Sequence, residues 1–134
     1  MSIETFRRFF RHPAGLLMGL IAFACRPDIP PHPYLDSEFL RQEVDAGRAF
    51  LIDSRSEEEF SQGHIPGAIN IPHTKMKENI SRVPKGMDII LYCGMGVRSQ
   101  KALEILRADG YERLFNFGGM DRYEGRLAIP GDPE

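Results

Sequence analysis

The stretch Asp88–Ser99, with the sequence DIILYCGMGVRS, decides the fold because it joins a strand, a loop and a helix start. The apolar run IILY has the length of a buried strand, and a cysteine stands where that run ends. Two glycines lead from there into residues 100–109, whose apolar side chains recur on one side of a helix. In open α/β sheets, ligands bind where strands end and helices begin. We therefore expect a binding site around Cys93.

The residues after Cys93 favour an anion. Gly94 and Gly96 permit a curled backbone, so that N–H groups and the helix dipole can turn toward one point, and Arg98 adds a full charge. This field predicts a lowered pKa for the Cys93 thiol and a nucleophilic thiolate. An inert core cysteine is the alternative, but it would not require two glycines and an arginine nearby. The predicted site is the nucleophile with six loop residues: Cys93, Gly94, Met95, Gly96, Val97, Arg98 and Ser99.

Outward from this stretch, predicted strands alternate with predicted helices. This pattern indicates a small doubly wound α/β domain, with a mainly parallel sheet and helices on both faces. Apolar runs predict strands at 48–53, 68–71, 88–92 and 114–117. Capping residues, apolar periodicity and terminal glycines predict helices at 36–46, 57–62, 75–81 and 99–109, and a last helical turn at 121–125.

Four stretches, in the right order, resemble the signatures of rhodanese-like sulfurtransferases. The loop from Cys93 is similar to the family's active-site loop, a Cys followed by four residues, Arg and Ser. The stretch Leu51–Arg55 (LIDSR) resembles the first signature, and Gly63–Pro72 (GHIPGAINIP) resembles the second. The stretch Asn116–Met120 (NFGGM) is similar to the late strand with its Gly-Gly. The resemblance covers residues 35–130, one whole domain, and implies the rhodanese-like fold.

The resemblance implies a single-domain thiosulfate:cyanide sulfurtransferase. The Cys93 thiolate would take the outer sulfur of thiosulfate, or of a similar anionic donor, and become a persulfide. Cyanide or a thiol would then accept that sulfur. The resemblance implies no metal and no organic cofactor, and small molecules are the expected partners. Met95 leaves the donor open, since thiosulfate-preferring relatives often carry basic residues there, whereas the pattern CGxGV is similar to mercaptopyruvate-using relatives.

Two other functions stay open. One is a persulfide carrier or binding module that delivers sulfur to a protein partner, although such binding modules often lack the cysteine that stands here at position 93. The other is a cysteine phosphatase or arsenate reductase. Related phosphatases place five residues between their cysteine and arginine, whereas this loop places four, Gly94–Val97, before Arg98. The shorter gap disfavours phosphate chemistry.

The charged residues near the predicted site allow more than one interpretation. Arg98 either holds the anionic donor or braces the loop against a carboxylate such as Asp53. Asp53 and Arg55 end a strand at the same edge as supporting residues, and for Arg55 we prefer an ion pair with a helix charge such as Glu59. His64 is interpreted as a hydrogen-bonded structural residue, because no proton transfer in this mechanism requires a base.

Composition limits the classes of function. The chain has 134 residues, of which 42% are hydrophobic and 27% charged, and this suits one globular domain. A net charge of −2 gives no case for a nucleic-acid surface. Two cysteines, Cys25 and Cys93, are too few for a disulfide scaffold or a structural zinc site. A monomer or a small homo-oligomer is expected.

The first 34 residues read differently from the rest. Arginines at 7, 8 and 11 precede the twelve-residue apolar run Ala14–Cys25, which is shorter than the ~20 residues of a membrane span. The run matches a signal peptide and ends in Ala-Phe-Ala before Cys25. We predict a signal peptide or membrane-associated segment at 1–24, with Cys25 a candidate for lipidation, and a Pro-rich linker at 25–34. The protein would be periplasmic or anchored facing the periplasm; a cytoplasmic protein with an ordered N-terminal helix is the alternative.

Overall fold

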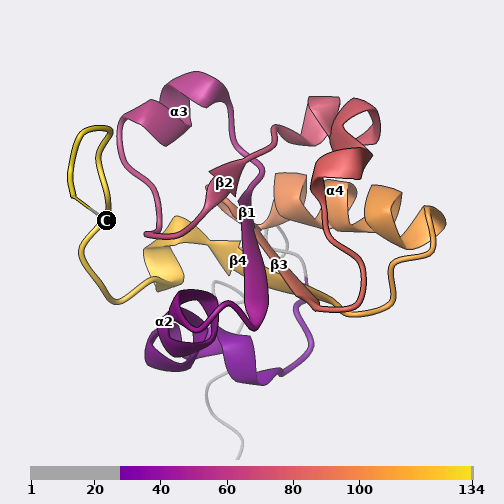
Figure 1. Ribbon diagram of the computed structural model, residues 1–134, viewed down its shortest axis with the longest axis horizontal. Helices are drawn as coiled ribbons and strands as arrows, with labels where there is room; N and C mark the ends of the chain where they lie inside the picture. The colour runs from indigo at the N-terminus through magenta and orange to yellow at the C-terminus, as the bar shows by residue number, and fades with distance from the viewer. Residues whose placement is uncertain (1–27, 134) are drawn as a thin grey trace, which may run out of the picture.

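The computed structural model describes residues 28–133, and its centre is a sheet of four parallel strands (Figure 1). The strands lie in the order β2-β1-β3-β4. Their bounds are Ala49–Asp53 (β1), Ile69–Asn70 (β2), Asp88–Cys93 (β3) and Leu114–Gly119 (β4). The α-helices are Ser37–Asp45 (α2), Glu57–Ser61 (α3) and Val97–Ala108 (α4), and the 3₁₀ segments are Pro33–Leu35 (η2), His73–Lys75 (η3), Lys77–Arg82 (η4) and Met120–Arg122 (η5).

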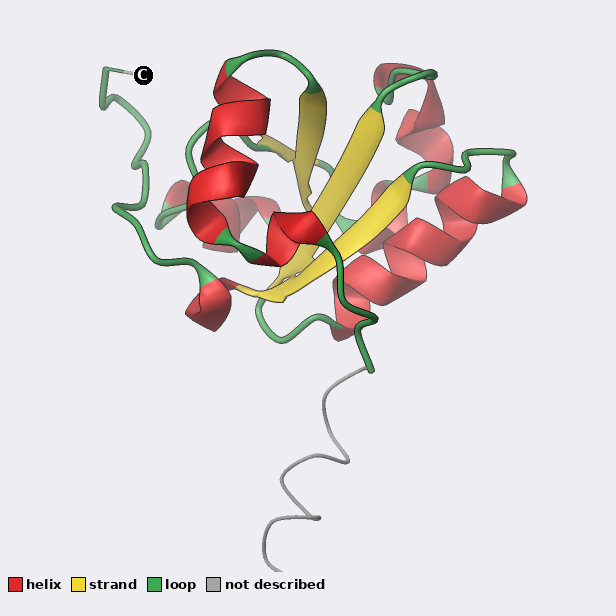
Figure 2. Ribbon diagram, turned by 90° about the horizontal axis from the view of Figure 1, so that it is seen from below, coloured by secondary structure: helices red, strands yellow, loops and turns green. Residues whose placement is uncertain are grey.

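Helices cover both faces of the sheet, as the sequence predicts (Figure 2). Side chains alternate along each strand, so neighbouring residues enter different cores. Leu91 packs in the core beneath α4, whereas Tyr92 packs in the core beneath α2. The next residue, Cys93, returns to the α4 face.

Strand β3 is central and buried because it pairs with β1 on one side and β4 on the other. Its residues Ile90 and Leu91 are fully buried, which explains the unbroken apolar run in the sequence. Each such side chain contributes on the order of 2 kcal/mol of hydrophobic stabilisation. The cysteine that follows is therefore held by the most buried strand of the domain.

Two helix starts form as their sequences predict. The Asp36 carboxylate accepts a hydrogen bond from the Phe39 N–H at 2.7 Å and caps α2. At α3, Ser56 and Glu59 form a capping box, with the Ser56 hydroxyl accepting from the Glu59 N–H and the Glu59 carboxylate accepting from the Ser56 N–H.

The helix predicted at 75–81 is wrong, because two 3₁₀ segments, η3 and η4, occupy this stretch. Asn79 has non-helical backbone angles, φ −110° and ψ 16°. Its side-chain amide donates to the Lys75 carbonyl at 2.8 Å, and such local bonds compete with the helix ladder. The predicted last turn at 121–125 also shifts, to η5.

The helix predicted from Ser99 starts earlier, at Val97, because Gly96 is its N-cap. Gly96 has φ 93°, a left-handed conformation that side chains disfavour and glycine adopts at little cost. Val97, Arg98 and Ser99 therefore lie in the first helical turn, where backbone N–H groups have no partner within the helix. The correction matters for function, since it points these N–H groups toward the end of β3.

The predictions for residues 1–24 and for Cys25 lie outside the described residues. The second half of the predicted linker is described, and it packs on the domain. Tyr34 is buried in the core beneath α2, and His32 bonds through Nε2 to the Asn116 carbonyl at 2.9 Å. The folded domain thus begins before residue 35. Within residues 28–133, no helix is long and apolar enough to cross a membrane.

Candidate active site

Cys93 lies at the carboxyl end of β3 with its sulfur enclosed by the loop that follows. The side chain is 1% exposed. Its Sγ accepts a hydrogen bond from the Gly96 N–H at 3.0 Å and lies 3.5 Å from the Ser99 hydroxyl. The structure therefore places the predicted nucleophile among donors of the predicted loop. A reagent of small size, or one that enters end-on, suits a sulfur this enclosed.

The surroundings of Cys93 lower its pKa below the ordinary value of a thiol. Burial alone raises the pKa, because it disfavours the charged form. Hydrogen bonds to the sulfur from the Ser99 side chain and from the N–H groups of Ser99, Met95 and Gly96 outweigh this effect. The thiolate is thus stabilised by directed donors, as an oxyanion is stabilised in acyl transfer.

Arg98 pairs with a carboxylate, as its possible bracing role predicts, but the partner is Glu59 and not Asp53. The two side chains form a fork-to-fork pair, with Nη1 to Oε2 at 2.6 Å and Nη2 to Oε1 at 2.9 Å. The Glu59 carboxylate also completes the capping box of α3, and its pKa falls to about 2, chiefly through the bond from Arg98. This ion pair therefore links α3 to α4 beside Cys93.

The same guanidinium stays close to the sulfur. A side chain at Gly94 would bring its Cβ to 3.2 Å from the Arg98 Nη2, so glycine leaves the space that the guanidinium occupies. The pKa of Arg98 is raised, first by the hydrogen bond to Glu59 and to a smaller degree by Cys93. Arg98 thus adds positive potential to the site while its hydrogen bonds hold the helices together.

The prediction that Arg55 pairs with a helix charge such as Glu59 is wrong, because Arg55 pairs with Asp53. The pair is buried, with Nη2 to Oδ2 at 2.6 Å and Nε near both carboxylate oxygens at 3.0 Å. Arg55 Nη2 donates as well to the Gly63 carbonyl at 2.7 Å. The guanidinium lies 5.9 Å from the centre of the Tyr92 ring, on the face opposite α4. Asp53 and Arg55 therefore support the edge from the other face, and their hydrogen bonds within the described residues do not reach the loop.

Two residues of the cysteine loop expose apolar side chains. Met95 is 62% exposed and Val97 39% exposed, and both are among the exposed large hydrophobic residues of the described chain. The end of β4 closes in from the other side: a Cβ at Gly119 would lie 2.6 Å from the Gly94 carbonyl oxygen and 3.1 Å from the Met95 Cα. Only glycine fits this approach, which explains the second glycine of the late Gly-Gly.

His64 is hydrogen-bonded, as predicted. Its ring stacks on Phe60 with the centroids 3.8 Å apart, and Nδ1 is 3.1 Å from the Phe60 carbonyl. Its backbone forms a bridge with Ala128. These contacts attach the segment after α3 to the C-terminal part of the chain.

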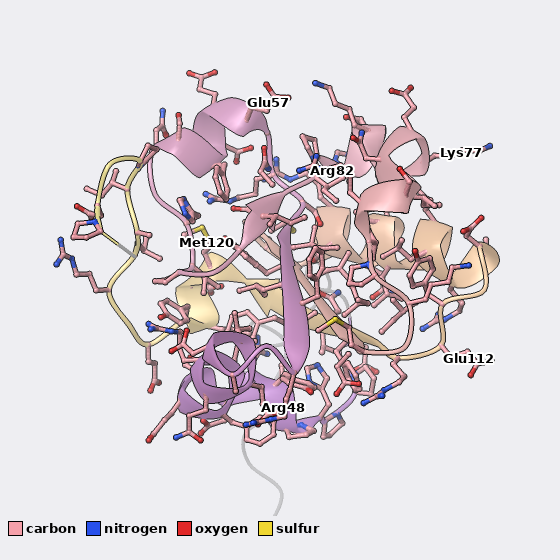
Figure 3. All side chains as sticks on the ribbon, viewed as in Figure 1. Arg48, Glu57, Lys77, Arg82, Glu112 and Met120 are labelled. Carbon is pink, nitrogen blue, oxygen red and sulfur yellow. The ribbon has the colours of Figure 1, made fainter. Side chains whose placement is uncertain are left out.

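Sequence reasoning missed two residues of this site. The first is Glu59, which we considered only as a partner of Arg55 and not of Arg98. The neighbouring Glu57 stands on α3 at the rim of the molecule and pairs with Lys75 (Figure 3). The second is Asn116, which was quoted in a motif but given no role. Its signal was a polar side chain in the otherwise apolar strand LFNFGG.

With this geometry established, comparison with known proteins identifies the family. The family described as "Rhodanese-like domain" matches residues 36–125. The chain belongs to this family. The parallel sheet, its flanking helices and the cysteine loop are thus those of a rhodanese-like domain.

The relatives of this rhodanese-like domain include named sulfurtransferases. A "Sulfurtransferase" of Allochromatium vinosum is 37% identical over 86 residues, which cover 63% of this chain and 80% of the relative. "Thiosulfate sulfurtransferase PspE" of Escherichia coli is 44% identical over 71 residues, 52% of this chain and 68% of that protein. A solved structure titled "rhodanese with anions from E. coli" is 36% identical with a TM-score of 0.57, over 60% of this chain and 98% of that one. These relatives support sulfur transfer as the general chemistry of the site.

Proposed function

We propose that this chain is a thiosulfate:cyanide sulfurtransferase, which moves the outer sulfur of thiosulfate or a similar anionic donor through a persulfide on Cys93. The observation that carries the proposal is the 3.0 Å hydrogen bond from the Gly96 N–H to Cys93 Sγ, within a four-residue gap before Arg98. N–H groups gathered on one sulfur stabilise a thiolate, and then the charge on a persulfide. The name of the PspE relative supports thiosulfate as the donor.

The proposed reaction has two half-reactions. In the first, the Cys93 thiolate attacks the outer sulfur of thiosulfate, a new S–S bond forms, and the old S–S bond breaks to release sulfite with its electron pair. In the second, cyanide attacks the outer sulfur of the persulfide, thiocyanate leaves, and the thiolate returns. A thiol acceptor would instead leave as a persulfide. Because both halves share one covalent intermediate, ping-pong kinetics are expected.

The test is mass spectrometry of the whole protein. Thiosulfate should add the mass of one sulfur atom to Cys93, and cyanide should remove it. Cys93→Ser is nearly isosteric and should stay folded without forming the adduct. An adduct that persists in this variant, or that forms on Cys25, would refute the proposal. Aryl phosphates serve as the second substrate class, and Cys93-dependent phosphatase activity would favour the phosphatase alternative.

The donor can be tested at Met95, which stands at the mouth and contributes no charge. We expect Met95→Arg to lower the KM for thiosulfate several-fold, because one more guanidinium near the entrance attracts a dianion. Met95→Gln, a polar variant without charge, is the matched control and should leave the KM close to that of the wild type. An unchanged KM in both variants would argue that thiosulfate does not pass this side chain.

One observation favours a second candidate, a persulfide carrier that hands sulfur to a protein. Met95 and Val97 of the loop expose apolar surface, and apolar surface is what a protein acceptor would cover. The kinetic test is simple: a carrier keeps the persulfide in the presence of cyanide and small thiols, whereas the enzyme loses it within each turnover. Rapid loss to small acceptors would exclude the carrier as the main function.

The location of the protein is a separate proposal, which rests on the sequence of residues 1–25 alone. We propose export to the periplasm, with cleavage before Cys25 or lipidation of that residue. Expression of the full chain in a bacterium, followed by cell fractionation and N-terminal sequencing, tests it. A cytoplasmic product that keeps Met1 would refute export, and incorporation of a labelled fatty acid would separate an anchored product from a soluble one.

A further inference from the structure

Asn116 of β4 uses every hydrogen-bonding position of its side-chain amide, and it is buried. Its Oδ1 accepts from the Ser99 hydroxyl at 2.8 Å and from the Gly118 N–H at 2.9 Å. Its Nδ2 donates to the Gly96 carbonyl at 3.1 Å and to the Gln100 side chain at 3.1 Å. A side-chain amide has two acceptor and two donor positions, so none is left over.

Two of these partners fix which way round the amide lies. The Gly118 N–H can only donate, and the Gly96 carbonyl can only accept. The oxygen must therefore face Gly118 and Ser99, and the nitrogen must face Gly96. The contacts of Asn116 are thus determined by backbone chemistry and not by a choice between two similar orientations.

Two partners of Asn116 are themselves donors to the nucleophile. Gly96 gives its carbonyl to Asn116 and its N–H to Cys93 Sγ at 3.0 Å. Ser99 lies between Asn116 Oδ1 at 2.8 Å and Cys93 Sγ at 3.5 Å. Asn116 is therefore linked to the sulfur by hydrogen bonds through two residues, Gly96 and Ser99.

The Ser99 hydroxyl has one hydrogen and lies between two acceptors, Asn116 Oδ1 and Cys93 Sγ. When Cys93 is a thiol, the hydrogen is best placed on Asn116, which is nearer and a stronger acceptor than sulfur. When Cys93 is a thiolate or persulfide, the negative sulfur attracts that hydrogen by rotation about one bond. After this exchange the Asn116 oxygen keeps the bond from the Gly118 N–H.

The strand around Asn116 is shaped for these contacts. Pairing between β3 and β4 is regular up to Asn116, opposite Leu91, and then shifts so that Tyr92 faces Gly118. A bulge of this kind re-aims a strand and takes an N–H out of the ladder. Asn116 accepts that N–H, and the re-aimed strand brings Gly119 against the cysteine loop.

We propose that Asn116 is a positioning residue for sulfur transfer, which holds Gly96 and Ser99 against Cys93 and shares the Ser99 hydrogen with the sulfur. The proposal rests on the proposed function for its purpose, but not for its test. It assigns no contact between Asn116 and the substrate. What Asn116 controls is the placement of the Gly96 N–H and the Ser99 hydroxyl around the sulfur, and the availability of the Ser99 hydrogen when the sulfur becomes charged.

The test is the pH dependence of Cys93 alkylation by iodoacetamide, followed on the peptide that contains Cys93 in the full-length protein. Asn116→Asp keeps the shape of the side chain and its acceptor oxygen. It places a carboxylate next to the Ser99 hydroxyl, which itself lies next to the sulfur. We expect the alkylation midpoint to rise by roughly one unit or more, or to split into two steps, because interacting acids titrate as a pair. A folded Asn116→Asp protein with one unshifted step would overturn the proposal.

Two further variants locate the effect. Gln100→Ala removes the second group that accepts from the Asn116 Nδ2, without changing Gly96 or Ser99, and it should leave the midpoint unchanged. In a Ser99→Ala background, Asn116→Asp should shift the midpoint less, since the shared hydrogen is gone. An equal shift in both backgrounds would show that the hydroxyl takes no part and would also overturn the proposal.

If Asn116→Asp does not fold, the proposal is tested on the wild-type protein instead. The side-chain amide signals of Asn116 in a nitrogen–proton correlation spectrum should titrate with the midpoint of Cys93 alkylation, because the Ser99 hydrogen leaves Oδ1 as the thiolate forms. Signals that stay constant through that midpoint would refute the exchange. None of these measurements uses a sulfur donor, so a failed persulfide assay and a failed Asn116 test are distinguishable results.

Discussion

Two arginine–carboxylate pairs lie near the edge of the sheet that carries Cys93, and they have different roles. The Asp53–Arg55 pair joins residues two apart in the chain, with side chains 0% and 9% exposed. The Glu59–Arg98 pair joins residues 39 apart, with side chains 39% and 32% exposed. The first is sealed beneath the edge beside Tyr92 and stabilises the domain. The second is half open to solvent and positions the loop.

The largest effect is expected from Asp53→Asn. This change leaves the Arg55 guanidinium buried without its counter-charge, and breaking such pairs costs about 3–5 kcal/mol. Chemical denaturation should show the loss as a lower midpoint with an unchanged slope. Replacing both residues, with Asp53→Asn and Arg55→Met together, should be less damaging than the single change, because no buried charge is left alone. A single change that costs under ~1 kcal/mol would remove the distinction between the two pairs.

Glu59→Gln should affect catalysis more than stability. Glutamine keeps the capping box with Ser56 but can satisfy only part of the Arg98 fork, so the loss of stability should stay under ~1 kcal/mol. The loop would be held less firmly, and we expect kcat for sulfur transfer to fall roughly tenfold. Glu58→Gln removes the same charge from an exposed neighbour and is the matched control. Equal kcat values for the two variants would contradict a positioning role for Glu59.

Ser54 stands between Asp53 and Arg55 in the chain. Replacing it should change the stability by a smaller amount and in the opposite direction. It is fully buried, and its hydroxyl has no hydrogen-bond partner within residues 28–133. An unsatisfied buried hydroxyl is destabilising, so Ser54→Ala should raise the free energy of unfolding by on the order of 1 kcal/mol. Thermal and denaturant unfolding measure this directly. A lower stability in Ser54→Ala would show that the hydroxyl has a stabilising interaction after all.

The smallest effect is expected for the pH dependence of the stability that the Glu59–Arg98 pair contributes. The pKa of Glu59 in the folded protein is about 2, below its ordinary value of 4.5. A lowered folded-state pKa stabilises the protein above the unfolded-state value, and this contribution is lost as the pH falls toward 2. The stability difference between wild type and Glu59→Gln should therefore be constant above about pH 5 and decrease below it. A difference that disappears near neutral pH would contradict this ordering.

Local patterns in the sequence were sufficient for the fold class and for the position of Cys93 at the end of a buried strand. The apolar run of β3, the capping box at Ser56 and the glycines around Cys93 each act over a few residues, so their consequences can be predicted from neighbours in the chain. Where a local side-chain bond decided the structure, as at Asn79, the helix prediction failed. The start of α4 failed by two residues, because the left-handed Gly96 ends the loop sooner than the periodicity indicates.

Only the tertiary structure decided which charges meet. The sequence contains both arginines and both carboxylates, and we paired Arg55 with Glu59 and considered Asp53 for Arg98, whereas the folded chain pairs them the other way. The reason is geometric: Asp53 and Arg55 turn to the same face at the end of β1, while α3 carries Glu59 across to the first turn of α4. Asn116 is the same kind of case, since its three hydrogen bonds with Gly96, Ser99 and Gln100 exist only once β4 lies beside β3.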